Sequence, residues 1–218
     1  MRTKTLLCAA ALAAGVVSTM AQSNVYSLNV VGYVNKTFTS GNYTLVSNPL
    51  NSPTNDLNTI LAAAPNFSQV NLWDVNLQDF SATIPTRISG SWSPNLVIPP
   101  GVGFFVIAGG NFTNTFVGEV LQGSLTNSVP LTGNGAYVAL ASMVPVGGSL
   151  TNVLAGYTPA AFDQVNLWDV NLQDFSSTIP TFVGGAWSPD INFPVGDGFF
   201  LIRSGSSTVT WVRNFTVQ

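Results

Sequence analysis

Apolar and polar residues alternate along several short runs of the chain, which is the period of a β-strand with one buried face. Near the C-terminus, Val209, Trp211, Phe215 and Val217 alternate with threonine and asparagine, and a similar run begins at Tyr26. Glycine and proline interrupt the runs at short intervals, as they do in sandwiches and barrels. The pattern predicts a mostly β protein with β-sandwich or barrel-like modules.

Two short segments follow the period of a helix instead. Their apolar residues recur at i, i+3 and i+4, as Leu57, Ile60 and Leu61 and again as Leu150, Val153 and Leu154. We expect Thr54 or Asn55 to cap the first helix and Ser149 to cap the second, with Pro65 and Pro159 beyond their ends. The sequence therefore predicts one short helix in each half.

The chain contains an internal duplication. Residues Gln69 to Ser81 recur unchanged from Gln164 to Ser176, an offset of 95 (164 minus 69). The offset persists in three later motifs, 83–86 with 178–181, 92–94 with 187–189, and 103–105 with 198–200. Such a series indicates a tandem repeat. We expect a signal peptide at 1–21, a first β module at 22–118 and a second at 119–218. We expect the two modules to pack against each other and to be related by an approximate two-fold axis or a translation.

The start of the chain has the plan of a secretory signal peptide. Arg2 and Lys4 precede a short apolar run, and small residues precede an expected cleavage after Ala21. Cys8 is the only cysteine and would leave with this peptide. We therefore expect an exported protein, secreted, at the cell surface or in the periplasm, without disulfides and without a transmembrane segment after processing.

The composition excludes some classes of protein and favours others. Hydrophobic residues make up 46% of the chain, which excludes a disordered polymer. Charged residues make up only 7%, against about 25% in ordinary globular proteins. With a net charge of −3 and no basic stripe, nucleic acid is not an expected partner. A nearly uncharged polar surface suits proteins that pack against copies of themselves or a matrix.

Several motifs together resemble a known family. They are NVVGYVN at 29–35, VSNPL at 46–50, PGVGFFV at 100–106, VGEVLQGSL at 117–125 and WVRNF at 211–215. In combination they resemble a family of uncharacterised secreted bacterial proteins, met mostly in Verrucomicrobia- and Planctomycetes-type genomes. The resemblance implies a secreted two-copy β protein and brings no activity with it. The second copy has Ala-Ser-Met at 141–143 where the first has Ser-Asn-Pro at 47–49, so this loop need not work alike in both.

Two glycine pairs invite comparison with a phosphate-binding loop. Gly101 and Gly103 recur as Gly196 and Gly198. A phosphate loop follows a strand and opens a helix, whereas each of these pairs precedes a β-forming run. We interpret both as tight turns that need a positive φ.

Catalytic chemistry has few candidates here. The chain has no histidine, and the expected mature chain has no cysteine, which removes catalytic triads, thiol chemistry and nearly all zinc sites. Asp74 with Asp79, or Asp169 with Asp174, would have to serve as paired carboxylates of a glycosidase. Two identical active sites in one small chain are unusual. We predict no enzyme, no catalytic residue and no cofactor.

The segment 74–79 also places oxygen-bearing side chains at alternate positions, as calcium loops do. It lacks the central glycine and the closing glutamate of the helix-loop-helix type. Aspartate and asparagine between strands more often form a turn through side-chain-to-backbone bonds, so we predict a turn and no metal. Four tryptophans at 73, 92, 168 and 187 remain either core residues or platforms for sugar rings.

The unchanged hairpin gives the candidate interaction site. Packing alone preserves only the size and polarity of apolar residues, so it does not explain identical polar residues. One explanation is local gene conversion; the other is that both hairpins present the same exposed turn to the same partner. The candidate residues are Trp73, Asn76, Gln78, Asp79, Trp168, Asn171, Gln173 and Asp174. We expect a non-enzymatic structural or adhesive protein of the envelope or matrix that self-associates, or alternatively a glycan-binding module.

Overall fold

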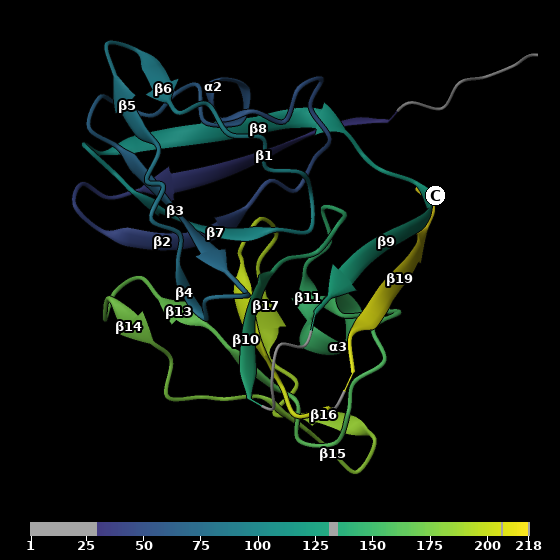
Figure 1. The fold of residues 1–218 in the computed structure, drawn as a ribbon. Helices are drawn as coiled ribbons and strands as arrows, with labels where there is room; N and C mark the ends of the chain where they lie inside the picture. Colours follow the sequence, from purple (N-terminus) through teal and green to yellow (C-terminus); the bar gives the residue numbers. More distant parts are fainter. Residues whose placement is uncertain (1–29, 131–134, 206, 218) are drawn as a thin grey trace, which may run out of the picture.

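The computed structural model describes residues 30–130, 135–205 and 207–217 (Figure 1). The expected signal peptide, with Cys8, and the strand start at Tyr26 lie outside these residues. The described chain is mostly β, as predicted, with antiparallel strand pairs and two helices of four residues each. Each sequence copy contributes one of these helices.

The first copy forms a long ribbon and a sheet. In the ribbon, β1 (Val31–Phe38) pairs with β8 (Phe112–Glu119) over the full length of both strands. The sheet has the order β2 (Tyr43–Ser47), β7 (Gly103–Ile107), β3 (Gln69–Asp74), β5 (Thr86–Ile88) and β6 (Ser91–Ser93), with β4 (Asp79–Phe80) paired to the end of β3. The helix α2 (Leu57–Ile60) covers one side of this half.

The second copy repeats this order. Its ribbon is β9 (Gly123–Val129) with β19 (Val209–Phe215), and its sheet runs β10 (Ala136–Leu140), β18 (Phe199–Arg203), β12 (Gln164–Asn166), β15 (Thr181–Val183) and β16 (Ala186–Ser188). The remaining elements are β11 (Gly148–Ser149) with β17 (Asn192–Phe193), β13 (Trp168–Asp169) with β14 (Asp174–Phe175), and α3 (Leu150–Val153).

Each copy has its own hydrophobic core between its ribbon, its sheet and its helix. Alternating residues of β8 and β19 point inward, so that Phe116 and Trp211 are fully buried at equivalent positions. Trp92 and Trp187 also belong to these cores, which confirms the core interpretation for those two tryptophans. A third, smaller cluster joins the two copies and is described below.

The helix caps were predicted correctly in one copy only. Ser149 caps α3, as expected, by accepting a hydrogen bond from the backbone N–H of Asn152. The prediction of Thr54 or Asn55 for α2 is wrong, because Asp56 caps it and accepts from Thr59 N. Asn55 has a left-handed backbone (φ 51°), and its side chain is bonded to the preceding loop.

The loop that differs between the copies has a structural reason for its difference. In the first copy, Asn48 is buried and its amide donates to Asn55 Oδ1 and to the backbone oxygen of Ile98. In the second copy the equivalent residue is Ser142, whose hydroxyl accepts from Val144 N at 3.3 Å. Met143 stands where the first copy has Pro49, and it packs into the hydrophobic core. The loop is thus held by a network of asparagines in the first copy, and by a serine bond together with apolar packing in the second.

The first glycine of each pair forms a turn with positive φ, as predicted, but the second does not. Gly101 and Gly196 have positive φ values of 96° and 82°. Gly103 and Gly198 are needed for a different reason, since a Cβ atom would lie 2.7 Å from the backbone oxygen of Leu140 at the first and 2.9 Å from that of Val46 at the second. In both cases the close neighbour belongs to the other copy.

Candidate functional site

The repeated hairpins begin with a turn that an aspartate holds in place. Asp74 Oδ1 accepts from the backbone N–H of Asn76 (2.9 Å) and Leu77 (3.3 Å), and Asp169 does the same in the second copy at 2.8 and 3.2 Å. The predicted side-chain-to-backbone turn is confirmed. Within the described ranges, no group of three or more His, Cys, Asp or Glu side chains is placed to hold a metal ion.

The glutamine of each hairpin reaches across to the other copy. Gln78 Oε1 accepts from Tyr137 N (2.7 Å), and its Nε2 donates to Tyr137 O (3.2 Å) and to Val75 O of its own turn (2.7 Å). Gln173 makes the same three bonds, at the same distances, to Tyr43 and Val170. The primary amide carries one donor group and one acceptor, so it pairs with a strand edge much as a backbone peptide would.

The tryptophan of each hairpin binds the same residue as the glutamine. Trp73 Nε1 donates to Tyr137 O, and Trp168 Nε1 donates to Tyr43 O, both at 2.8 Å. Their rings pack edge-to-face on the opposite copy, with Trp73 5.1 Å from Phe200 and Trp168 5.0 Å from Phe105. Both indoles are half-buried in the small third cluster. They therefore serve as interface residues within the chain, and their polar ends are occupied.

These contacts are reciprocal, which identifies an approximate two-fold relation between the copies and decides against a translation. Backbone bonds follow the same rule, since Ser47 N donates to Gly196 O (2.9 Å) and Ala141 N donates to Gly101 O (3.0 Å). Isolated bridges join Val46 of β2 to Asp197, and Leu140 of β10 to Val102. Figure 1 shows β7 near β10 where the two copies meet. One edge of each sheet, formed by β2 in the first copy and β10 in the second, is thus covered inside the molecule.

The eight predicted site residues therefore separate into two groups. Trp73, Gln78, Trp168 and Gln173 contact a surface outside their own copy, as hypothesised, but that surface is the other copy of the same chain. The placement of Gln78 and Gln173 at a freely exposed turn is wrong, because both are half-buried between the copies.

The other four residues remain at the surface. Asn76, Asp79, Asn171 and Asp174 are exposed, and the two aspartates accept from the backbone N–H of the residue that follows them. Their contact with a partner stays a prediction. The reciprocal interface also supplies an explanation for the unchanged hairpin that sequence reasoning missed: each copy must fit the same edge geometry in the other.

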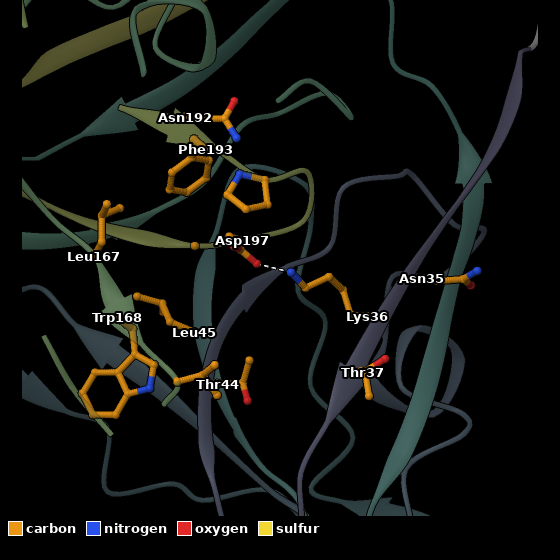
Figure 2. A pocket seen from close by; sticks show the side chains of 13 residues that line it. Asn35, Lys36, Thr37, Thr44, Leu45, Leu167, Trp168, Asn192, Phe193 and Asp197 are labelled. Atoms are coloured by element: carbon orange, nitrogen blue, oxygen red, sulfur yellow. Dashed lines mark hydrogen bonds and ion pairs between the residues drawn. The ribbon is translucent and has the colours of Figure 1, made fainter. Parts of the chain in front are cut away.

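A cavity of about 320 Å³ lies beside this interface. Residues of both copies line it, among them Lys36, Thr37, Trp168, Asn192, Phe193 and Asp197. Figure 2 shows Lys36 reaching from β1 to form an ion pair with Asp197, which lies between Phe193 on one side and Leu45 with Trp168 on the other. Burial raises the pKa of the Asp197 carboxyl above its usual value, and the ammonium group of Lys36 opposes that shift only in part.

A second buried ion pair lies inside the core of the second copy. Asp163 and Arg203 are 0% and 1% exposed, with Nε 3.4 Å from Oδ2. The hydroxyl of Tyr157 donates to the same carboxylate oxygen at 2.6 Å. Burial, together with this bond, raises the pKa of Tyr157 far above its usual range.

Sequence reasoning found neither ion pair. Lys36 and Asp197 are separated by 161 positions, and no local pattern connects them. Asp163 and Arg203 did leave a signal, because the first copy has Ser68 and Ala108 at the equivalent positions. Two opposite charges gained in the same copy of a chain with so few charged residues indicate a compensated pair.

Comparisons with protein-family models, with curated proteins and with solved structures find no match for this chain. Among the helices that the structure describes, none is both long and apolar enough to cross a lipid bilayer.

Proposed function

We propose that this protein is a secreted, non-enzymatic component of an envelope layer or extracellular matrix, with a structural or adhesive role, and that it associates with copies of itself. The observation that carries the proposal is a phenylalanine exposed at the same position in both copies. Phe67 is 76% exposed and Phe162 is 66% exposed. Exposed apolar surface is typical of interaction sites, and we interpret the repeated exposure of this phenylalanine in that way.

The backbone conformation of these two residues strengthens the case for a contact role. Phe67 and Phe162 have φ values of 66° and 69°, in the left-handed region that aromatic residues rarely adopt. That conformation costs about 1–2 kcal/mol per residue relative to a right-handed one. The neighbours have changed between the copies, from Pro65, Asn66 and Ser68 to alanine, alanine and aspartate. A side chain kept at a cost, where the core does not use it, supports a role in contact with another molecule.

The position of the two residues supports assembly into chains. Phe67 N donates to Arg87 O of β5, and Phe162 N donates to Phe182 O of β15. In Figure 1 these two strands lie at opposite ends of the molecule. A molecule with the same contact surface at both ends can join a neighbour at each, which gives an open assembly rather than a closed pair.

Exchange of both phenylalanines for asparagine tests this role. We expect Phe67→Asn with Phe162→Asn to weaken self-association while raising the free energy of unfolding by up to about 1 kcal/mol per site, because asparagine tolerates the left-handed region. Sedimentation velocity over a wide concentration range, electron microscopy of concentrated protein and urea denaturation would measure these effects.

The control removes other exposed apolar groups of similar size. Ile84 and Ile179 are 47% and 42% exposed at equivalent positions, and neither has a positive φ. Ile84→Asn with Ile179→Asn should associate like the parent. A parent protein that stays monomeric at every concentration, or an asparagine variant at 67 and 162 that associates unchanged, would refute the proposal.

A second candidate function is glycan binding, favoured by the cavity beside the interface. Its wall includes Trp168 and Phe193, and its polar groups include the paired Lys36 and Asp197. Sugar rings combine apolar faces with hydroxyl groups, so they suit such a lining. An array of immobilised glycans would separate this function from assembly.

A further inference from the structure

We propose that the cavity between the two copies is a site for one ring of a neutral sugar, held by the Lys36–Asp197 pair. This inference rests on the second candidate function, since it names the site and the class of ligand. The cavity volume of about 320 Å³ lies at the lower end of the roughly 300–1,000 Å³ usual for small-molecule sites. A single sugar ring is an appropriate occupant for a space of that size.

The cavity arises from particular side chains and not from the repeat itself. The register of the two ribbons pairs Lys36 with Asn114 and Val129 with Val209, and Val209 follows Asn114 at the repeat offset. Lys36 is therefore equivalent to Val129, and Asp197 is equivalent to Val102. Because Val129 and Val102 are uncharged, they cannot form the ion pair that Lys36 and Asp197 form on the cavity side.

On that other side the equivalent hairpin residue is packed more closely. Val75 of the first hairpin packs against the core of the second copy. Asn127 Nδ2 donates to Gly101 O at 3.0 Å, and it lies 2.8 Å from the place that a Cβ of residue 101 would occupy. Val170, the equivalent of Val75, instead lines the cavity. Of the two equivalent valines, Val75 is thus packed against a core, Val170 lines the open cavity, and the charged pair lies on the side of Val170.

The chemistry of the pair favours a neutral polyhydroxylated ligand. Lys36 and Asp197 compensate one another's charge, so neither a cation nor an anion gains net attraction. Lys36 Nζ can donate to a sugar oxygen, and the Asp197 carboxylate can accept from a sugar hydroxyl, both as charge-assisted bonds. Phe193, Pro194 and Leu45 provide apolar surface for the ring faces. Burial of the carboxylate makes hydroxyl donors valuable there, because water solvates it poorly.

The test uses an array of immobilised neutral and uronic-acid oligosaccharides, followed by calorimetry with the soluble form of the neutral glycan that binds. We expect binding to neutral glycans in preference to uronic acids. Val170→Trp, which places an indole in the cavity, should weaken binding by at least about tenfold. Leu172→Trp is the matched control on the same turn, since Leu172 is 69% exposed and does not line the cavity, and it should bind within about twofold of the parent.

A second variant keeps the test decisive if the tryptophan at 170 disturbs the fold. Lys36→Met with Asp197→Asn removes both charges at nearly constant volume and should also weaken binding by at least about tenfold. Absence of binding to any neutral glycan by the parent, or parent-like affinity in either cavity variant with an unchanged melting temperature, overturns the proposal. Self-association is measured separately through Phe67 and Phe162, so failure of the sugar site and failure of assembly are distinguishable.

Discussion

Replacement of Asp163 by alanine should lower the free energy of unfolding by about 3–5 kcal/mol, the range seen when one partner of a buried ion pair is removed. Arg203 is 1% exposed, and its guanidinium group would be left charged and without its carboxylate in the core of the second copy. Tyr157 and the backbone N–H groups of Ala160 and Ser204 would lose an acceptor at the same time. Urea denaturation followed by tryptophan fluorescence would measure the loss.

The first copy provides the matched control for this change. Ser68 occupies the position equivalent to Asp163, is equally buried, and accepts a single neutral bond from Gly109 N at 3.0 Å. Ser68→Ala should cost only about 1 kcal/mol. Equal losses from Asp163→Ala and Ser68→Ala would show that the charge of Arg203 does not determine the effect.

A double substitution separates the cost of leaving Arg203 charged and unpaired from the cost of the lost hydrogen bonds. Asp163→Ser with Arg203→Ala gives the second copy the two residues that the first copy already has at these positions. The double variant should be at least as stable as Asp163→Ser alone, because no buried charge remains unpaired. A double variant less stable than that single one would mean that the packing of the arginine side chain outweighs its charge.

The features that the sequence predicted are those determined within a few residues. Alternation of period two identified the strands, and the positive φ of Gly101 and Gly196 followed from their place before β-forming runs. Asp74 holds its turn through bonds to the next residues, so a local rule was sufficient. The cap of α2 was missed because Thr54, Asn55 and Asp56 are all good caps, and only the loop network that engages Asn55 selects among them.

The interface could not be predicted in this way because its contacts join residues far apart in the chain. Gln78 and Tyr137 are 59 positions apart, and Trp168 and Tyr43 are 125 positions apart. A repeat in the sequence shows that two copies exist, but it does not show which of their surfaces contact each other. The sequence did hold one clue, since the polar residues of the hairpin are the same in both copies. Only the structure explains this, because each glutamine contacts the same sheet edge in the other copy.

The same geometry predicts that the glutamines stabilise the union of the two copies. Gln78→Ala with Gln173→Ala should lower the free energy of unfolding by about 1–2 kcal/mol per site. Each substitution removes two bonds to an edge tyrosine and one bond to the hairpin's own turn. The exposure of Tyr43 and Tyr137 lets water replace part of what is lost, which places the effect in the lower part of the range for buried groups.

Symmetry supplies a strict form of this test. The two glutamines make the same bonds at the same distances, so the two single substitutions should cost the same within about 0.5 kcal/mol, and their effects should be close to additive. Asn76→Ala with Asn171→Ala is the control on the same turns, because both asparagines are exposed, and it should shift stability by no more than about 0.5 kcal/mol. Glutamine variants as stable as this asparagine control would mean that water satisfies the sheet edges unaided. The unchanged hairpin would then need another cause, either gene conversion or an external partner at Asn76, Asp79, Asn171 and Asp174.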